Sequence, residues 1–306
     1  MVRYVEIEGM RLPRIGLGTW QFGTREWGYG EGYATIPAPS LIHRATELGI
    51  TMLDTAEAYG PARSEWIVGE TLAQLAPAVR ASLTIATKFT PIAPAEPIVA
   101  WQVAGSRRRL GGGPIDLLYV HWKNPFVSVR RVMQSVRPLV ETGHVRHTGV
   151  SNFSLAQWQE AERAMRRPVV ANQVQFSLVA PVPARDLVPY AAAMGRVVVA
   201  YSPLGQGLLS GRTEWPGSLG RTQGKRASRK KGIDPLRAVL ASVAIAHGAT
   251  PAQVALAWVI SHPNTIAIPG ARTLEQLEQN AAAADLELAP DELARLTAAS
   301  RLFAGR

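Results

Sequence analysis

The sequence contains no cysteine. Disulfide bonds, thiolate metal sites and thiol nucleophiles are therefore excluded, although this absence does not by itself assign a compartment. No uninterrupted apolar run approaches the roughly 18 residues expected of a membrane-spanning helix. The N-terminus alternates polar and apolar residues where a signal peptide would have an apolar core. We therefore predict a soluble cytoplasmic protein whose chemistry uses oxygen and nitrogen side chains.

Several functional signatures are also missing. There is no Gly-x-Ser-x-Gly elbow and no phosphate-binding P-loop, so no motif in the sequence supports a hydrolase or nucleotide-kinase function. The cluster Gly28, Gly30 and Gly32 follows no buried strand and opens no helix, unlike a dinucleotide-binding fingerprint. His144 and His147 are spaced like two metal ligands, but residues three apart on a strand face opposite ways. We predict no metal site.

Positive charge exceeds negative charge, with 33 Lys and Arg against 23 Asp and Glu, for a net charge of +10. Six of the basic residues gather in a Gly- and Ser-rich stretch from Arg221 to Lys231. Such a stretch is either a solvated loop or a flap that faces a phosphate. No aromatic platform or groove-reading helix accompanies these charges, so we predict neither nucleic-acid nor membrane binding.

Strand and helix patterns alternate along the chain of 306 residues, 47% of them hydrophobic. A hairpin around Gly9 is predicted first, and two helices after the last strand. Between them we predict eight short apolar strands, nearly all followed by a helix: Ile15 to Thr19, Met52 to Thr55, Leu83 to Lys88, Leu117 to Trp122, Val145 to Val150, Val170 to Phe176, Val197 to Ser202 and Thr265 to Pro269. Eight such units predict an α/β (β/α)8 TIM barrel with an N-terminal β-hairpin and extra C-terminal helices, as a single domain over residues 1–306. An open doubly wound sheet is the alternative.

Among the predicted helices, we expect one from Ser40, as its N-cap, to Leu48. Another is expected from Ala184 to Met194, and the last from Asp291 to Ala299.

Four ionisable side chains lie at or just after the ends of three successive predicted strands: Asp54, Tyr59, Lys88 and His121. Hydride addition to a carbonyl leaves an alkoxide, which needs a proton donor within hydrogen-bond reach. Tyr59 could supply the proton if a neighbouring Lys88 ammonium lowered the phenol pKa, with Asp54 holding Lys88 charged. Each residue alone also has an ordinary structural interpretation: a cap, a solvated lysine or a core histidine.

The residues around these four positions resemble the aldo-keto reductase superfamily. The segments DTAEAYG from Asp54, TKF from Thr87 and YVHW from Tyr119 are similar to its tetrad motifs. GVSNF from Gly149, NQV from Asn172 and YSPLG from Tyr201 are similar to its nicotinamide-site motifs, and IPGAR from Ile268 through Asn280 to its adenosine-phosphate segment. The resemblance runs in the family's order from about Ile15 to Asn280, and implies a (β/α)8 barrel that binds NAD(P)H across the carboxyl ends of its strands.

The resemblance also implies residue roles. Tyr59 would be the proton donor, with Asp54, Lys88 and His121 completing the catalytic tetrad. Apart from the resemblance, the side chains of Trp20 and Trp122 could line an apolar substrate pocket together with Tyr59 and His121, or they could be plain packing at the barrel rim. The cofactor contacts would be Gly18, Thr19, Trp20, Asp54, Ser151, Asn152, Gln173, Tyr201, Ser202, Pro203, Leu204, Gly205, Gly207, Leu209, Ile268, Pro269, Gly270, Arg272, Gln276, Gln279 and Asn280. Trp27 is a weaker pocket candidate.

Two positions depart from the family's pattern. Many relatives have an acidic residue where this chain has Gln279, and several have a basic residue where it has Gln276. Arg272 and the basic loop can still neutralise a 2′-phosphate, so we expect NADPH/NADP+ as cofactor, with NADH less favoured. We further expect the basic loop, within residues 211–233, to order when cofactor binds.

The sequence therefore predicts an NADPH-dependent oxidoreductase that reduces a small-molecule carbonyl substrate. The alternative is a cofactor-binding redox-sensing or regulatory subunit on the same fold with little turnover. Binding of the basic loop to an anionic surface is a third possibility. A monomer is the default expectation, because no heptad stretch indicates a partner. The short C-terminal tail predicts an open, permissive pocket.

Overall fold

The computed structural model describes residues 4–23, 37–211 and 233–304. Its main sheet has eight strands in the order β10, β9, β8, β7, β6, β5, β4, β3, and neighbouring strands are parallel. The two edges of this sheet meet through a parallel bridge between Ile15 and Ala267, where Gly16 N donates to Ala267 O at 2.8 Å. The strands are β3 (Leu17–Gly18), β4 (Met52–Asp54), β5 (Thr84–Phe89), β6 (Ile115–Val120), β7 (Val145–Ser151), β8 (Val169–Gln175), β9 (Val197–Tyr201) and β10 (Thr265–Ala267). The strands lie side by side in their sequence order and the two edges of the sheet meet, which confirms the (β/α)8 barrel and not the open sheet.

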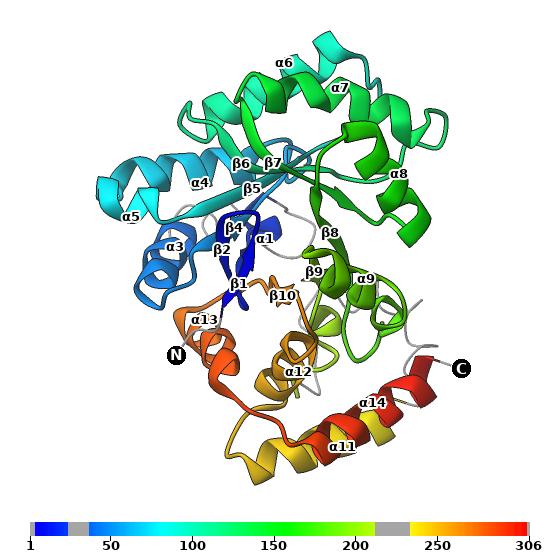
Figure 1. Ribbon diagram of the computed structural model, residues 1–306. Helices are drawn as coiled ribbons and strands as arrows, with labels where there is room; N and C mark the ends of the chain where they lie inside the picture. The colour runs from blue at the N-terminus through cyan, green and yellow to red at the C-terminus, as the bar shows by residue number, and fades with distance from the viewer. Residues whose placement is uncertain (1–3, 24–36, 212–232, 305–306) are drawn as a thin grey trace.

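Helices surround the strands (Figure 1). They are α1 (Trp20–Gly23), α3 (Pro37–Glu47), α4 (Arg63–Gln74), α5 (Pro77–Ala81), α6 (Glu96–Arg109), α7 (Val129–Glu141), α8 (Leu155–Met165), α9 (Leu187–Met194), α11 (Asp234–Ala246), α12 (Pro251–Ile260), α13 (Leu274–Ala282) and α14 (Pro290–Ala304), with short 3-10 turns η1 (Val182–Ala184), η2 (Gly205–Gly207) and η4 (Ala283–Asp285). The additional C-terminal helix α14 packs along α11 at the bottom of Figure 1.

A hairpin closes one end of the barrel. Strands β1 (Tyr4–Ile7) and β2 (Met10–Pro13) pair antiparallel through a turn in which Glu8 (φ 48) and Gly9 (φ 80) are both left-handed, as two-residue hairpin loops require. Hairpin side chains such as Ile7 and Leu12 share one buried cluster with the barrel-interior residues Met52 and Leu117. Met52 begins its strand, so the hairpin covers the amino end, and Figure 1 shows it across the middle of the ring. The carboxyl end remains for the site.

The barrel has two separate hydrophobic cores because strand side chains alternate. In β9, Val197 and Val199 belong to the interior cluster, whereas Val198 and Ala200 belong to the cluster between strands and helices. A strand buried on both faces therefore has an apolar side chain at every position. This is why the strands could be predicted as continuous apolar runs.

Several predicted boundaries are wrong. Helix α3 begins at Pro37, so Ser40 lies inside it and is not its N-cap; prolines are tolerated in a first turn, where an N–H has no intrahelical partner. Strand β6 begins two residues before Leu117 and ends before His121. The helix predicted from Ala184 is divided, because the Asp186 side chain caps α9 by accepting from Leu187 N. The last helix continues past Ala299.

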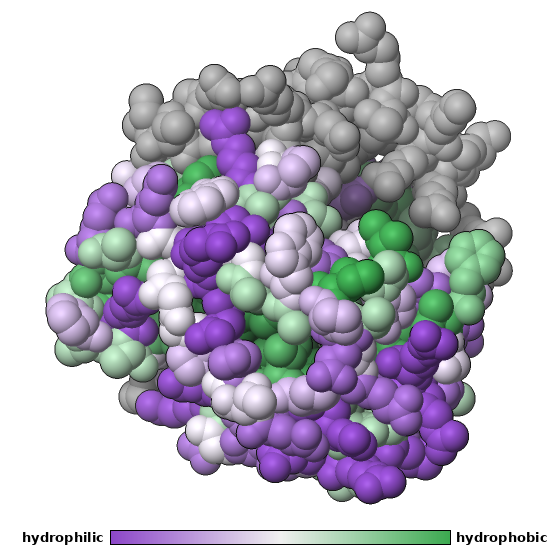
Figure 2. Space-filling model, turned by 90° about the horizontal axis from the view of Figure 1, so that it is seen from above, coloured by the Kyte–Doolittle hydropathy of each residue, from purple (hydrophilic) through white to green (hydrophobic). Residues whose placement is uncertain are grey.

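One face of the molecule is mainly polar. The face seen from above in Figure 2 lies over the helices at the top of Figure 1 and is mainly hydrophilic, with separated hydrophobic patches. Among the described helices, none alone has both the length and the apolar character to cross a membrane; α11 and α12, at 96° to one another, meet that criterion only when joined.

Candidate active site

The structure brings Asp54, Tyr59 and Lys88 into direct contact at the carboxyl end of the barrel. Asp54 ends β4, Tyr59 lies in the following loop, and Lys88 projects from β5. Lys88 Nζ donates to Asp54 Oδ1 at 2.5 Å, to Tyr59 Oη at 3.1 Å and to the carbonyl oxygen of Thr55 at 2.8 Å. An ammonium has three N–H donors, so these three bonds hold the buried cation completely.

His121 completes the group from the loop after β6. Its ring meets the Tyr59 ring edge-to-face, with centroids 5.8 Å apart, and lies against Trp122 at 3.9 Å. The imidazole is buried, and among the described residues its Nδ1 has no hydrogen-bond partner. The four side chains that sequence reasoning selected therefore share one site.

Burial determines how these groups titrate. Burial, together with the positive charge of Lys88, lowers the pKa of His121 to about 3, so the imidazole is neutral at pH 7. Burial raises the pKa of Tyr59 above its ordinary value, although Lys88 acts to lower it. Lys88 lowers the phenol pKa as expected, but burial, which the expectation did not consider, outweighs it. The consequence is a phenol that keeps its proton at neutral pH.

The Asp54 and Lys88 pair is held at the bottom of the site. Burial lowers the pKa of Lys88, but the Asp54 carboxylate and the Tyr59 oxygen outweigh it, so the net pKa is raised and the ammonium is retained. Burial raises the pKa of Asp54, against the opposing effects of Lys88 and Gln173. Gln173 contributes from β8, where its Nε2 donates to Asp54 Oδ2 at 2.7 Å. Both carboxylate oxygens thus have donors.

A hydroxyl network fixes the loop that carries Tyr59. Thr19 Oγ1 donates to the Asp54 carbonyl oxygen at 2.9 Å, Ser64 Oγ donates to the Thr19 carbonyl oxygen at 2.9 Å, and Thr55 Oγ1 donates to Ser64 Oγ at 2.9 Å. These bonds join the ends of β3 and β4 to the start of α4. Thr19 was expected at the cofactor; in the structure its buried hydroxyl supports Asp54.

Two glycines allow α1 to pack against the same loop. Gly60 has φ +60, and a Cβ built on it would lie 1.8 Å from the Gly23 carbonyl oxygen. A Cβ on Gly23 would lie 2.3 Å from the Tyr59 carbonyl oxygen. Only residues without a side chain allow this approach, which fixes the backbone at Tyr59 and Gly60.

A buried ion pair lies behind Lys88, and sequence reasoning missed it. Glu65 on α4 accepts from Thr87 Oγ1 at 2.6 Å and pairs with Arg109 Nε on α6 at 2.6 Å. Glu65 is fully buried, and Thr87 directly precedes Lys88 in β5. The pair joins positions 44 residues apart, so no local pattern could have indicated it.

The predicted nicotinamide-site residues lie at the ends of β7, β8 and β9. Ser151 Oγ donates to the Gln173 carbonyl oxygen at 2.9 Å, and Asn152 Nδ2 donates to Ser151 Oγ at 3.1 Å. Tyr201 Oη donates to Asn152 Oδ1 at 2.9 Å. Asn152 has φ 62, which asparagine tolerates better than most residues. The four residues therefore form one hydrogen-bonded group beside Asp54, in which Gln173 accepts from Ser151 through its backbone carbonyl oxygen.

The remaining predicted cofactor segments follow β9 and β10. After β9, Ser202 (φ 48) and Gly205 (φ 57) are left-handed, and Leu209 is fully buried in the core. After β10, Arg272 N donates to Gln276 Oε1 at 2.9 Å, and Asn280 Nδ2 donates to the Gly270 carbonyl oxygen at 3.3 Å. Gln279 donates within helix α13 to Glu275 at 3.2 Å.

Gln21, which was not predicted, joins this second segment to α1. Its Nε2 donates to the Ala271 carbonyl oxygen at 3.2 Å, and a Cβ on Gly270 would lie 2.7 Å from its Oε1. The only sequence signal was its position beside the predicted Trp20.

A model of the aldo/keto reductase family matches residues 14–301. The chain belongs to the aldo/keto reductase family. It is 46% identical over 310 aligned positions to the uncharacterized oxidoreductase Rv2298 of Mycobacterium tuberculosis, covering 99% of this chain and 94% of that protein. It is 32% identical over 295 positions to the methylglyoxal reductase YeaE of Escherichia coli, covering 93% of this chain and 90% of that protein.

Solved structures agree with this membership. An aldo/keto reductase from Klebsiella pneumoniae, in complex with NADP and acetate, superposes with a TM-score of 0.78 at 28% identity, covering 99% of this chain and 96% of that one. The likeness extends over nearly the whole chain, so it includes all the strand ends that form the site.

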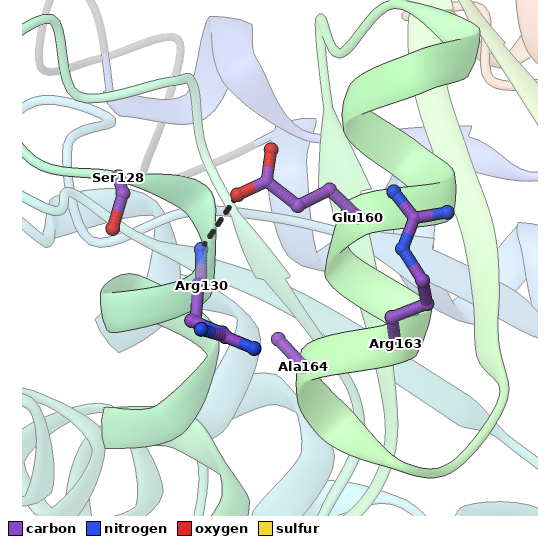
Figure 3. Close-up of a pocket in the computed structure, with 5 residues that line it drawn as sticks. All are labelled: Ser128, Arg130, Glu160, Arg163 and Ala164. Atoms are coloured by element: carbon purple, nitrogen blue, oxygen red, sulfur yellow. Dashed lines mark hydrogen bonds between the residues drawn. The ribbon is translucent and has the colours of Figure 1, made fainter.

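Other features of this reductase lie away from the tetrad. A hollow of about 300 Å³ opens between α7 and α8, lined by Ser128, Arg130, Glu160, Arg163 and Ala164 (Figure 3). Its lining comes from helices and not from the carboxyl ends of the strands, where Asp54, Tyr59, Lys88 and His121 lie. In the described part of the chain no three His, Cys, Asp or Glu residues are grouped to bind a metal ion. Trp27 and the basic loop fall outside the described residues, so the prediction of loop closure stays a prediction.

Proposed function

We propose that this aldo/keto reductase reduces aldehydes and ketones to alcohols, with NADPH as hydride source and Tyr59 as proton donor. The observation that supports this most directly is the contact of Tyr59 Oη with Lys88 Nζ at 3.1 Å, with Lys88 itself held by Asp54 at 2.5 Å. A protonated phenol beside a fixed ammonium can give up its proton and leave a phenolate that the ammonium stabilises.

His121 would orient the carbonyl. Because burial keeps the imidazole neutral, it carries one N–H. We assign this proton to Nε2, because the buried Nδ1 has no partner among the described residues and an N–H there would be left unbonded. Nε2–H would then donate to the substrate oxygen, and Tyr59 would transfer the proton. The Trp122 ring, packed on His121, restricts rotation of the imidazole.

The residues at the strand ends fit a nicotinamide cofactor. The group formed by Ser151, Asn152 and Gln173 offers amide and hydroxyl atoms, which a carboxamide needs as both donors and acceptors. Tyr201 supplies a ring beside them, and the glycine-bearing segment after β9 allows close backbone approach. When bound, the cofactor supplies hydride to the carbonyl carbon.

NADPH is favoured over NADH by two observations. Arg272 follows β10 in the segment that resembles the family's adenosine-phosphate site, and a guanidinium can pair with a 2′-phosphate. The Klebsiella pneumoniae relatives were crystallised with NADP and with NADPH.

The test is NADPH oxidation with aromatic and aliphatic aldehydes, comparing wild type with Tyr59→Phe. The change removes the acidic proton and keeps the ring, so we expect turnover to fall by about 10³-fold or more while cofactor affinity holds. Tyr4→Phe is the matched control, because Tyr4 lies in the hairpin at the opposite end of the barrel. Equal turnover in wild type and Tyr59→Phe would refute the assignment of the acid. Cofactor binding without turnover in either protein would instead favour a redox-sensing subunit.

A further inference from the structure

A second tyrosine, Tyr119, lies inside the barrel next to the tetrad, and the proposed reaction does not use it. It projects from β6 into the interior cluster and is fully buried. Lys88 on β5 pairs with Tyr119, and Tyr119 pairs with Gly149 on β7. Residues that pair in this way point to the same face of a sheet. The three residues therefore form one row inside the barrel, with Tyr119 directly beside Lys88.

The Tyr119 ring is held closely by its neighbours in this row. A Cβ built on Gly149 would lie 2.6 Å from both Cδ1 and Cε1 of Tyr119, so the ring occupies the space that the missing side chain leaves. Lys88 Nζ lies over the Tyr119 ring, 5.8 Å from its centroid, and 4.8 Å from the centroid of the Tyr59 ring. Both distances are within the roughly 6 Å at which a cation is attracted to an aromatic face. The Lys88 ammonium therefore contacts two phenols, one of which is Tyr119.

The Tyr119 hydroxyl is buried and makes no hydrogen bond of ordinary geometry within the part of the chain that the structure describes. Burial, followed by the charge of Asp54, raises the pKa of Tyr119 well above its ordinary value, and the Gln173 side chain acts in the opposite direction. The phenol therefore keeps its proton at neutral pH. A buried hydroxyl without a full hydrogen bond destabilises a fold, and phenylalanine would supply the same ring without it. The hydroxyl therefore indicates a role beyond packing.

The Tyr119 hydroxyl lies close to the link between Gln173 and Asp54. Gln173 Nε2 donates to Asp54 Oδ2 at 2.7 Å, and Asp54 Oδ1 accepts from Lys88 Nζ at 2.5 Å. The Asp54 carboxylate is therefore shared between an amide and an ammonium. A side-chain amide has a donor end and an acceptor end, and only the donor end can serve a carboxylate. A phenol proton bonded to the acceptor end of Gln173 keeps the donor end on Asp54.

We propose that Tyr119 is a positioning residue for the tetrad, which fixes the Gln173 amide on Asp54 and thereby keeps the Lys88 ammonium on the Tyr59 hydroxyl. The inference rests on the proposed function and adds a residue to it. Without the Tyr119 hydroxyl, Gln173 would hold Asp54 less firmly, and Asp54 would draw Lys88 away from Tyr59. The charge of Asp54 acts to raise the pKa of Tyr59, whereas Lys88 acts to lower it. Tyr59 should then be a weaker acid.

The test is Tyr119→Phe, which removes the hydroxyl and keeps the ring. NADPH oxidation with one aldehyde is followed across the pH range for wild type and variant. We expect kcat to fall by about three- to tenfold, and the pH at which kcat/KM declines on the basic side to rise by about half a unit or more. A residue that served packing alone could change kcat or stability, but it would not move this pH.

Tyr190→Phe is the matched control. The Tyr190 hydroxyl donates to Glu162, which also pairs with Arg196, and Arg196 pairs with Glu8 in the hairpin at the amino end of the barrel. Tyr190→Phe should lower the midpoint of thermal unfolding, because a hydrogen bond is lost, and leave the pH profile unchanged. Tyr119→Phe should show the opposite pattern, with a midpoint at least as high as that of wild type and a shifted profile.

The outcomes separate this inference from the proposed function. Absence of turnover with every aldehyde in wild type would refute the reductase function only. Ultraviolet titration of tyrosine ionisation still decides the inference, because the difference between each protein and its counterpart with Tyr59→Phe isolates the ionisation of Tyr59. Ionisation of Tyr59 at a higher pH in Tyr119→Phe than in wild type would establish the positioning role. Ionisation at the wild-type pH, or an equal shift in Tyr190→Phe, would overturn it.

Discussion

Removal of the Arg109 guanidinium should leave the buried Glu65 carboxylate without its ion-pair partner and lower the free energy of unfolding. Glu65 is fully buried, and its two carboxylate oxygens are bonded to Thr87 and Arg109, each at 2.6 Å. Arg109→Met keeps much of the apolar stem but removes the guanidinium. Breaking a buried pair from one side typically costs about 3 to 5 kcal/mol. Because the Arg109 side chain is 15% exposed, we expect a loss of about 3 kcal/mol in the free energy of unfolding.

The opposite substitution should cost less. Glu65→Gln leaves Arg109 unpaired, but the guanidinium is partly exposed and can reach water, and the Gln oxygen can still accept from Thr87. We expect a loss of about 1 to 2 kcal/mol. The double variant contains no unpaired buried charge, so it should be more stable than Arg109→Met alone. The resulting coupling energy should be about 2 kcal/mol.

The assay is urea unfolding followed by circular dichroism for wild type, the two single variants and the double variant. Arg44→Met is the control, because Arg44 pairs with Glu47 and Glu278 on the surface, where ion pairs contribute little to stability. A loss below about 1 kcal/mol for Arg109→Met, or losses that simply add in the double variant, would refute the argument. It would mean that the Glu65 carboxylate reaches water when Arg109 is absent.

Two further predictions concern the tetrad. Gly60→Ala should lower turnover by at least about tenfold, because Gly60 has φ +60 and a Cβ there would lie 1.8 Å from the Gly23 carbonyl oxygen and displace Tyr59. Gly112→Ala is the control: Gly112 has φ +86 but a Cβ there meets open space, so this change should cost only about 1 kcal/mol in the free energy of unfolding. Equal losses of turnover in the two variants would contradict this argument. The pKa of His121 is about 3 in the folded protein against an ordinary value of 6.5. Between these two pH values the unfolded chain therefore binds more protons than the folded one. The contribution of the neutral His121 to stability is thus fully present above pH 6.5 and is lost as the pH falls toward 3. Unfolding titrations should therefore show a slope steeper by up to about 1.4 kcal/mol per pH unit in wild type than in His121→Phe, and parallel slopes would show that the imidazole is not buried neutral.

The strands and the tetrad could be predicted because each depends on a strong local signal. A strand buried on both faces, such as β9, reads as an apolar run, and the end of that run fixes where a loop begins. A parallel barrel then places every such end on one rim, so Asp54, Lys88 and His121 had to lie near one another once the fold was right. The family resemblance supplied the roles, which spacing alone had left open.

The supporting contacts could not be predicted, because they join positions that only the closed barrel brings together. Glu65 and Arg109 are 44 positions apart, and Gln21 and Ala271 are 250 apart. Neither pair has a composition or period that distinguishes it from ordinary loop residues. The left-handed backbone of Gly60 is likewise visible only when Gly23 lies against it.

The pKa of Tyr59 combines the effect of one neighbour, which sequence reasoning could consider, with the effect of burial in the whole site, which it could not. Sequence reasoning considered one neighbour, Lys88, and the sign of that interaction is correct in the structure. The net direction is opposite because burial acts on every charged form in the site at once. It keeps Tyr59 protonated and His121 neutral, so the ammonium of Lys88 is the only cation among the four side chains and depends on Asp54 for its charge. Under the proposed function, a site assembled in this way would hold a proton on the phenol until negative charge develops on a carbonyl oxygen beside it, which is when the reaction would need that proton.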